Sequence, residues 1–197
     1  MKEVFLTFAK YNQEANKVIA GILGKLSNDD REKDRKSYYK SLSNLFRHNI
    51  GATAYFLSVL LDAVPENIEA KKALAPLAKL KNQEGKLTEG QWKTEISNAK
   101  LTDKALVDFI DALEEKDFEA PVKLDWYKGK PPSVPLWFFL EQQVSHNIHH
   151  RGQISQILDS LKIDNDFSGI SVKIICPPPP RKEKTPADSA ATPPASI

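Results

Sequence analysis

Four stretches of this sequence carry apolar side chains at intervals of three and four residues, the spacing that places them on one face of an α-helix. They cover residues 4–26, 38–60, 102–115 and 136–161. A helix with one apolar face is stable when that face packs against other helices. Hydrophobic residues make up 41% of the 197 residues, enough for such a core. We therefore predict an all-α fold in which four helices form a bundle.

The segment between the second and third of these helices has no clear period. Pro76, Gly85 and Gly90 interrupt residues 64–101, although the intervening stretches have helical composition. We expect a variable insertion or short helices there. Thr102 has a side chain suited to capping a helix N-terminus, so the third helix is predicted to begin at this residue.

Prolines mark two further segments. Residues 118–135 contain Gly129 and four prolines, which predicts a short extended or hairpin-like crossover before the last helix. Four prolines follow Cys176, and the chain then ends in a stretch rich in Thr, Ala, Pro and Ser. Such a composition buries too little apolar surface to fold. We predict one domain over residues 1–170 and a disordered tail over 176–197.

Composition argues against several classes of partner. The 28 basic and 26 acidic residues leave a net charge of +2, which gives no field for collecting nucleic acid. The one cysteine cannot form an intramolecular disulfide, as is usual in a reducing compartment. Residues 1–26 are amphipathic and lack the apolar run of a signal peptide or membrane span. We expect a cytoplasmic protein that binds neither nucleic acid nor membranes.

The chain has four histidines, and three of them lie within five residues, as His146, His149 and His150. Residues four apart share one face of a helix, so His146 and His150 can direct their imidazoles toward one point. His48, on the apolar face of the second helix, is the remaining histidine. A transition-metal site needs at least one ligand beyond such a pair, and imidazole suits zinc, nickel or iron. We predict that His48, His146 and His150 bind one divalent transition metal.

An alternative is that each histidine forms hydrogen bonds inside the core without a metal. His149 lies off the apolar stripe of its helix. We expect it either at the surface or in contact with the metal ligands, without binding the metal itself. Gln143 and Gln153 either orient a ligand or reach the bundle surface. Tyr55 either supplies a hydroxyl near the metal or belongs to the core.

Two neighbours of the histidines carry expectations of their own. Arg151 is expected to be a surface charge. Gly152 lies inside a predicted helix, where glycine is unfavourable, so we expect another element to pack closely against it.

The motif His-x-x-x-His-Arg-Gly-Gln-Ile at residues 146–154, the upstream His48 and the motif Tyr-Asn-x-x-Ala-Asn at residues 11–16 together resemble the DinB/YfiT family. The likeness covers roughly residues 3–165. It implies an up-down-down-up four-helix bundle that dimerises and holds a metal through three histidines. These ligands fall here on His48, His146 and His150.

The resemblance also bears on function, because the family includes thiol-dependent transferases, metal-dependent hydrolases and stress-induced proteins without assigned activity. Three neutral imidazoles leave the full charge on the ion and a fourth coordination position for water or a substrate sulfur. We expect a metal-dependent hydrolase or an S-transferase that uses a low-molecular-weight thiol. The sequence predicts a small-molecule substrate but does not identify it. The catalytic residues are unknown, because Glu141 points away from His146 and no other general base is evident. The alternative is a non-catalytic, stress-associated metal-binding protein.

Overall fold

Helices make up most of this computed structural model, which describes residues 1–123 and 133–167. Within these ranges the α-helices are α1 Lys2–Leu23, α2 Asn28–Glu32, α3 Leu42–Leu61, α4 Ile68–Leu74, α5 Glu89–Ala112 and α6 Leu136–Ser160. The 3₁₀ helices are η1 Ala75–Lys79 and η2 Glu115–Glu119, and the strands are β1 Pro121–Lys123 and β2 Ser133–Pro135. The prediction of an all-α fold is confirmed, with this small sheet as its only β-structure in the described part of the chain.

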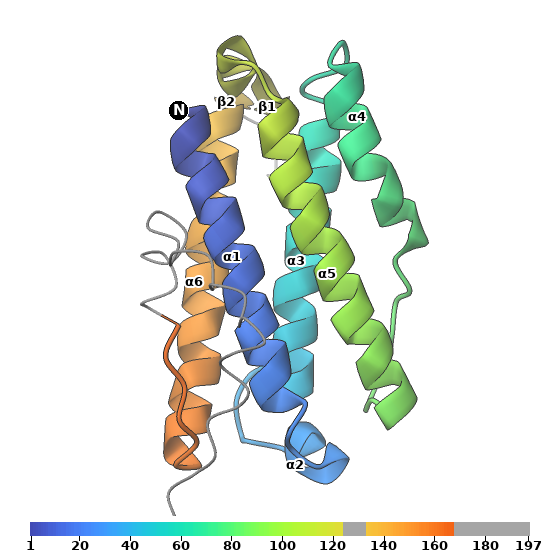
Figure 1. Cartoon of the computed structure of the whole chain (residues 1–197), viewed down its shortest axis with the longest axis vertical. Coiled ribbons are helices and arrows are strands. Elements are labelled where there is room, and N and C mark those ends of the chain that lie inside the picture. The colour runs from blue at the N-terminus through green and yellow to red at the C-terminus, as the bar shows by residue number, and fades with distance from the viewer. Residues whose placement is uncertain (124–132, 168–197) are drawn as a thin grey trace, which may run out of the picture.

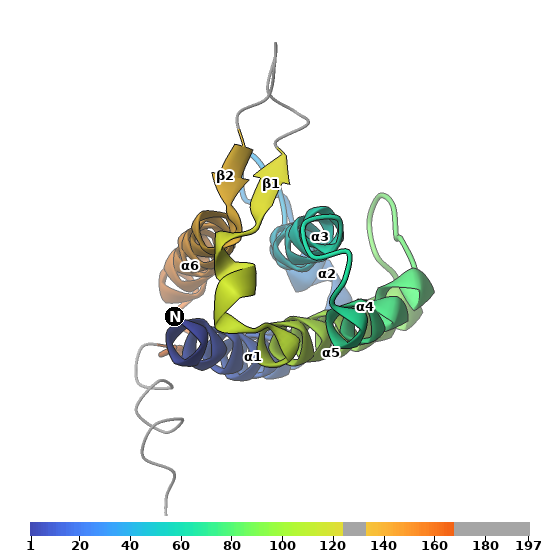
Figure 2. The same cartoon turned by 90° about the horizontal axis from the view of Figure 1, so that it is seen from above.

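The long helices form two layers. In one layer α1, α5 and α4 lie side by side, and α3 and α6 form the other (Figure 2). Figure 1 shows α1 and α6 running in one direction along the long axis and α3 and α5 in the opposite direction. Over the described ranges, no helix combines the length and the apolarity needed to cross a lipid bilayer.

The third long helix begins earlier than predicted. Helix α5 starts at Glu89, where the Thr88 side chain accepts from the backbone N–H of Gln91 and the Gln91 side chain accepts from that of Thr88. Thr102 is buried inside this helix, so its predicted role as the N-cap is wrong. The first half of α5 is mostly polar, so the sequence shows no clear helical spacing of apolar residues there. Gly90 falls in the first turn and does not interrupt the helix.

The segment before α5 contains the short helices α4 and η1, with Pro76 at the start of the latter. Gly85 has a φ of +65°, a left-handed backbone that glycine adopts at little cost.

The second long helix begins later than the predicted range 38–60. Helix α3 begins after the Ser41 cap, and Tyr38 lies outside it with 91% of its surface exposed.

The crossover into α6 is a two-stranded antiparallel hairpin. Val122 pairs with Val134, and Val122 points into the core. The prediction of a hairpin-like crossover is confirmed for these strands. Its residues 124–132, like the predicted tail 176–197, lie outside the described residues.

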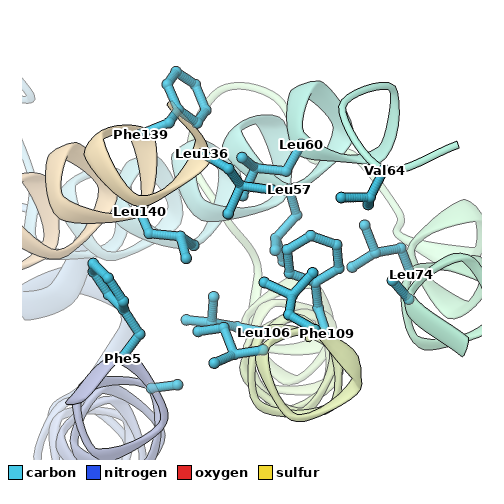
Figure 3. Close-up of a cluster of buried hydrophobic side chains, with 14 of the residues drawn as sticks. Phe5, Leu57, Leu60, Val64, Leu74, Leu106, Phe109, Leu136, Phe139 and Leu140 are labelled. Carbon is cyan, nitrogen blue, oxygen red and sulfur yellow. The ribbon is translucent and has the colours of Figure 1, made fainter. Parts of the chain in front are cut away.

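The core has two apolar halves separated by polar side chains. Near the hairpin, side chains from α1, α3, α4, α5 and α6 meet in one cluster, shown in Figure 3. A second cluster, which includes Ile19, Phe46 and Trp92, fills the other end. On each long helix, buried polar residues lie between its two apolar segments. This polar layer contains Asn12, Asn16, Asn49, Thr53, Thr102, Asp103, Gln143, Asn147 and Arg151.

Candidate metal centre

The three predicted histidines meet where α3 packs against α6. His48 comes from α3, and His146 and His150 come from successive turns of α6. The Nε2 atom of His146 lies 3.2 Å from that of His48 and 3.1 Å from that of His150. One ligand atom from each residue lies within 4.8 Å of the other two. The structure therefore brings together the complete set of residues that the sequence singled out.

These separations suit a small metal ion. Zinc bonds imidazole nitrogen at about 2.0–2.1 Å, so two nitrogens of a tetrahedral site lie about 3.3–3.4 Å apart. The two shorter separations in this cluster, 3.2 and 3.1 Å, are close to that value. The donor set thus fits one divalent ion, with His48, His146 and His150 as the residues that could hold it.

Gln153 orients one of these imidazoles. Its Oε1 atom lies 2.8 Å from Nδ1 of His150. An amide oxygen only accepts, so Nδ1 donates and carries the ring proton. The Nε2 lone pair of His150 is then free to bind a metal, the arrangement common among metal-binding histidines. Of the two predicted roles for Gln153, the structure supports the one that orients a ligand.

The site also contains Tyr39, which sequence reasoning missed. Its hydroxyl lies 2.9 Å from Nε2 of His48. Its ring stacks on His48 at a centroid distance of 4.3 Å and meets His150 edge-on at 5.2 Å. Tyr39 lies in the loop between α2 and α3, where no helical period marks it as inward-facing.

Tyr55, the tyrosine that the sequence pointed to, is not a core residue. It is 51% exposed and lines a hollow beside β1 with Ser58 and Asp62. Its neighbour Phe56 packs edge-on against His146, with ring centroids 5.6 Å apart.

The environment of the three histidines favours their neutral forms. Burial, with the neighbouring His150 and His48, lowers the pKa of His146 to about 4. Burial also lowers the pKa of His48, assisted by His150, and that of His150. Imidazole binds a metal through a deprotonated nitrogen, so at neutral pH no proton has to leave these rings before an ion binds.

Comparison with known proteins agrees with this geometry. The family model described as the DinB family matches residues 1–161. This chain belongs to the DinB family. Searches of curated proteins and of solved structures gave no significant match. The histidine cluster and the family together make this a DinB protein with a candidate metal site.

Behind the histidines of this DinB chain, the polar layer links three helices through Asn12. Its Oδ1 accepts from Nδ2 of Asn147 at 2.8 Å and from Nη1 of Arg151. Its Nδ2 donates to Oδ1 of Asp103 at 2.8 Å, and Asn16 donates to the same oxygen at 2.9 Å. Both asparagines of the Tyr-Asn-x-x-Ala-Asn motif therefore tie α1 to α5, and Asn12 also ties α1 to α6.

Asp103 is the carboxyl of this layer. Burial raises the pKa of Asp103 to about 7, although the bond from Asn16, the charge of Arg151 and the bond from Asn12 act in the opposite direction. On the side facing α3, Gln143 donates to Oγ1 of Thr53 at 3.4 Å. Gln143 is thus buried in the polar layer and does not reach the bundle surface.

Two predictions about the neighbours of His150 are wrong. Arg151 is only 3% exposed, and its guanidinium lies 4.9 Å from the centroid of the Tyr11 ring. Its buried charge has partners on α1 and α5, which a reading of α6 alone does not reveal. Gly152 has no close neighbour, since a Cβ atom added there would meet nothing within 4 Å. His149 is exposed at the surface.

Proposed function

We propose that this DinB protein is a metal-dependent enzyme, either a hydrolase or a transferase that uses a low-molecular-weight thiol. Its metal would be a divalent zinc, nickel or iron ion held by His48, His146 and His150. The observation that carries the proposal is the convergence of three Nε2 atoms, two pairs of which lie 3.1 and 3.2 Å apart.

The chemistry follows from the donor set. Three neutral imidazoles leave a divalent ion with its full charge and with a coordination position for a fourth ligand. Such an ion would act as a Lewis acid, which lowers the pKa of a bound water or thiol toward neutral pH. The chain itself contributes the neutral imidazoles and the bond from Gln153 that orients His150. We assign no general base.

A non-catalytic metal-binding role is the second candidate. The observation that favours it is the composition of the cluster, which contains histidines and no carboxylate among the described residues. Glu141, the nearest acidic residue along α6, is exposed and accepts a hydrogen bond from Ser145 at 2.6 Å. A protein that stores or senses metal needs the three histidines but needs no proton acceptor.

The test combines metal analysis with activity screens. Purified protein loaded with zinc, nickel or iron is assayed for thiol conjugation and for hydrolysis of ester and amide panels. The enzyme proposal expects turnover that is lost in His146→Ala and retained in His149→Ala, the control variant at the neighbouring exposed histidine. Stoichiometric metal with background activity throughout would favour the non-catalytic role.

Two further features of the family belong to this proposal. The helix directions in Figure 1 support an up-down-down-up bundle. The homodimer implied by the family resemblance also stays a prediction, which sedimentation analysis of the purified chain tests directly.

A further inference from the structure

We propose that Tyr39 is a positioning residue of the metal centre, whose hydroxyl donates a hydrogen bond to an anionic ligand in the fourth coordination position. The ligand class is a small anion with a free lone pair, such as the thiolate of a low-molecular-weight thiol. The inference rests on the proposed metal site, but it does not require that the protein be an enzyme.

The first argument concerns the partner of the Tyr39 hydroxyl, which lies 2.9 Å from Nε2 of His48. An Nε2 atom that coordinates a metal neither donates nor accepts a hydrogen bond, because its lone pair is shared with the ion. Metal binding at His48 therefore takes away the partner that this hydroxyl has. The partly buried hydroxyl is then free to donate to another acceptor, and a ligand on the same ion would be adjacent to it.

The second argument concerns the position of the tyrosine ring. Tyr39 stacks on His48 with a centroid distance of 4.3 Å and an interplanar angle of 29°. The edge-on contact with His150 has a centroid distance of 5.2 Å. Contact with two of the three ligand rings keeps the phenol next to the point on which the Nε2 atoms converge.

The third argument concerns the loop that carries Tyr39. Lys36 and Lys40 have φ values of 57° and 64°, in the left-handed region that side chains other than glycine rarely adopt. The backbone N–H of Arg35 donates to the carbonyl of Lys40 at 2.6 Å, which closes the loop around Tyr39. Ser41, two residues later, caps α3 and fixes the end of the loop. This local backbone strain persists only where the surroundings enforce it, as at ligand-binding positions.

The fourth argument is chemical. The three imidazoles are neutral, so they do not balance the charge of a divalent ion, and the fourth ligand is favoured when it is an anion. A phenol O–H donates to such an anion, and hydrogen bonds to charged groups are the stronger kind. The loop thus provides a hydroxyl donor beside the three imidazoles, which favours an anion as the fourth ligand.

The experiment titrates azide into the full-length protein loaded with Co²⁺, with the change in the visible absorption spectrum as the readout. Tyr39→Phe removes only the hydroxyl, and Tyr38→Phe is the matched control, since Tyr38 is 91% exposed. The proposal expects Tyr39→Phe to weaken azide binding about tenfold or more, the effect of one hydrogen bond to a charged group. Co²⁺ affinity in that variant should change less than about threefold. Tyr38→Phe should match the wild type.

Equal azide affinity in wild type and Tyr39→Phe would overturn the inference and leave the metal site intact. The inference would also fail if Cu²⁺-loaded wild type showed a phenolate-to-copper absorption band that Tyr39→Phe lacked, because Tyr39 would then be a ligand itself. A wild-type protein that binds no Co²⁺ would overturn the proposed metal site together with this inference. Circular dichroism of each variant confirms that it is folded.

Discussion

The Nε2 atoms of His48 and His146 lie 3.2 Å apart, although 98 positions separate the two residues in the chain. The packing of α3 against α6 creates this contact, and the rings lie at the level of the polar layer that separates the two apolar clusters. The metal centre proposed here therefore depends on how four helices are held together, as well as on the spacing of residues within α6.

The metal-free protein should lose stability in mild acid because of His146. An unfolded histidine takes up a proton near pH 6.5, whereas burial and the neighbouring His150 and His48 lower the pKa of folded His146 to about 4. Between these pH values the unfolded chain binds more protons than the folded chain. The free energy of unfolding is then fully retained above about pH 6.5 and falls as the pH drops toward 4.

Urea unfolding of metal-free wild type and His146→Gln at pH 7 and pH 4.5 measures this effect. The wild type should lose about 1–2 kcal/mol more than the variant, since partial exposure weakens the full effect of the shift. Equal losses in the two proteins would mean that His146 does not titrate as described.

Arg151 should contribute strongly to stability. Arg151→Met keeps an unbranched side chain but removes the bond to Asn12 and the contact with the Tyr11 ring. We expect the free energy of unfolding to fall by about 2–3 kcal/mol, the range for losing a hydrogen bond to a buried charged group. Urea unfolding measures it, and Lys100→Met, at an exposed position on α5, is the control with an expected change within about 0.5 kcal/mol. A surface-like effect for Arg151→Met would contradict the buried network.

The capping box at Thr88 should hold the first turns of α5. Thr88→Ala removes the side-chain oxygen that accepts from the backbone N–H of Gln91. The expected loss is about 1 kcal/mol in the free energy of unfolding, with faster hydrogen exchange in the first turns of α5. Thr94→Ala is the control, because Thr94 is a partly exposed threonine whose hydroxyl bonds the carbonyl of Gly90 within the same helix and does not cap it. If both variants behaved alike, α5 would not depend on this cap.

These residues differ in how far the sequence predicts them. His146 and His150 were predictable because a spacing of four places both on one helix face. The first half of α5 was missed because its residues are mostly polar, and a helix with few apolar side chains leaves little period. Tyr39 was missed because a loop residue has no period at all, and its contact with His48 depends on the backbone of that loop.

Arg151 shows a different limit. A charge in a predicted helix is normally assigned to the solvent face, and the opposite is true here because Asn12 of α1 accepts its bond and Asp103 of α5 supplies a nearby carboxyl. Those partners are far away in sequence. Pairing across helices is information about the tertiary structure, so periodicity within one helix cannot contain it.

The most direct test of the central claim is the metal stoichiometry of purified wild type and His48→Ala, measured by elemental analysis after loading with zinc and removal of excess ion. His48 is the ligand that α3 contributes, and His149→Ala is the matched control. The account predicts one ion per chain in wild type and in His149→Ala, and a loss of stoichiometric binding in folded His48→Ala. Undiminished binding in His48→Ala would contradict a centre built from His48, His146 and His150.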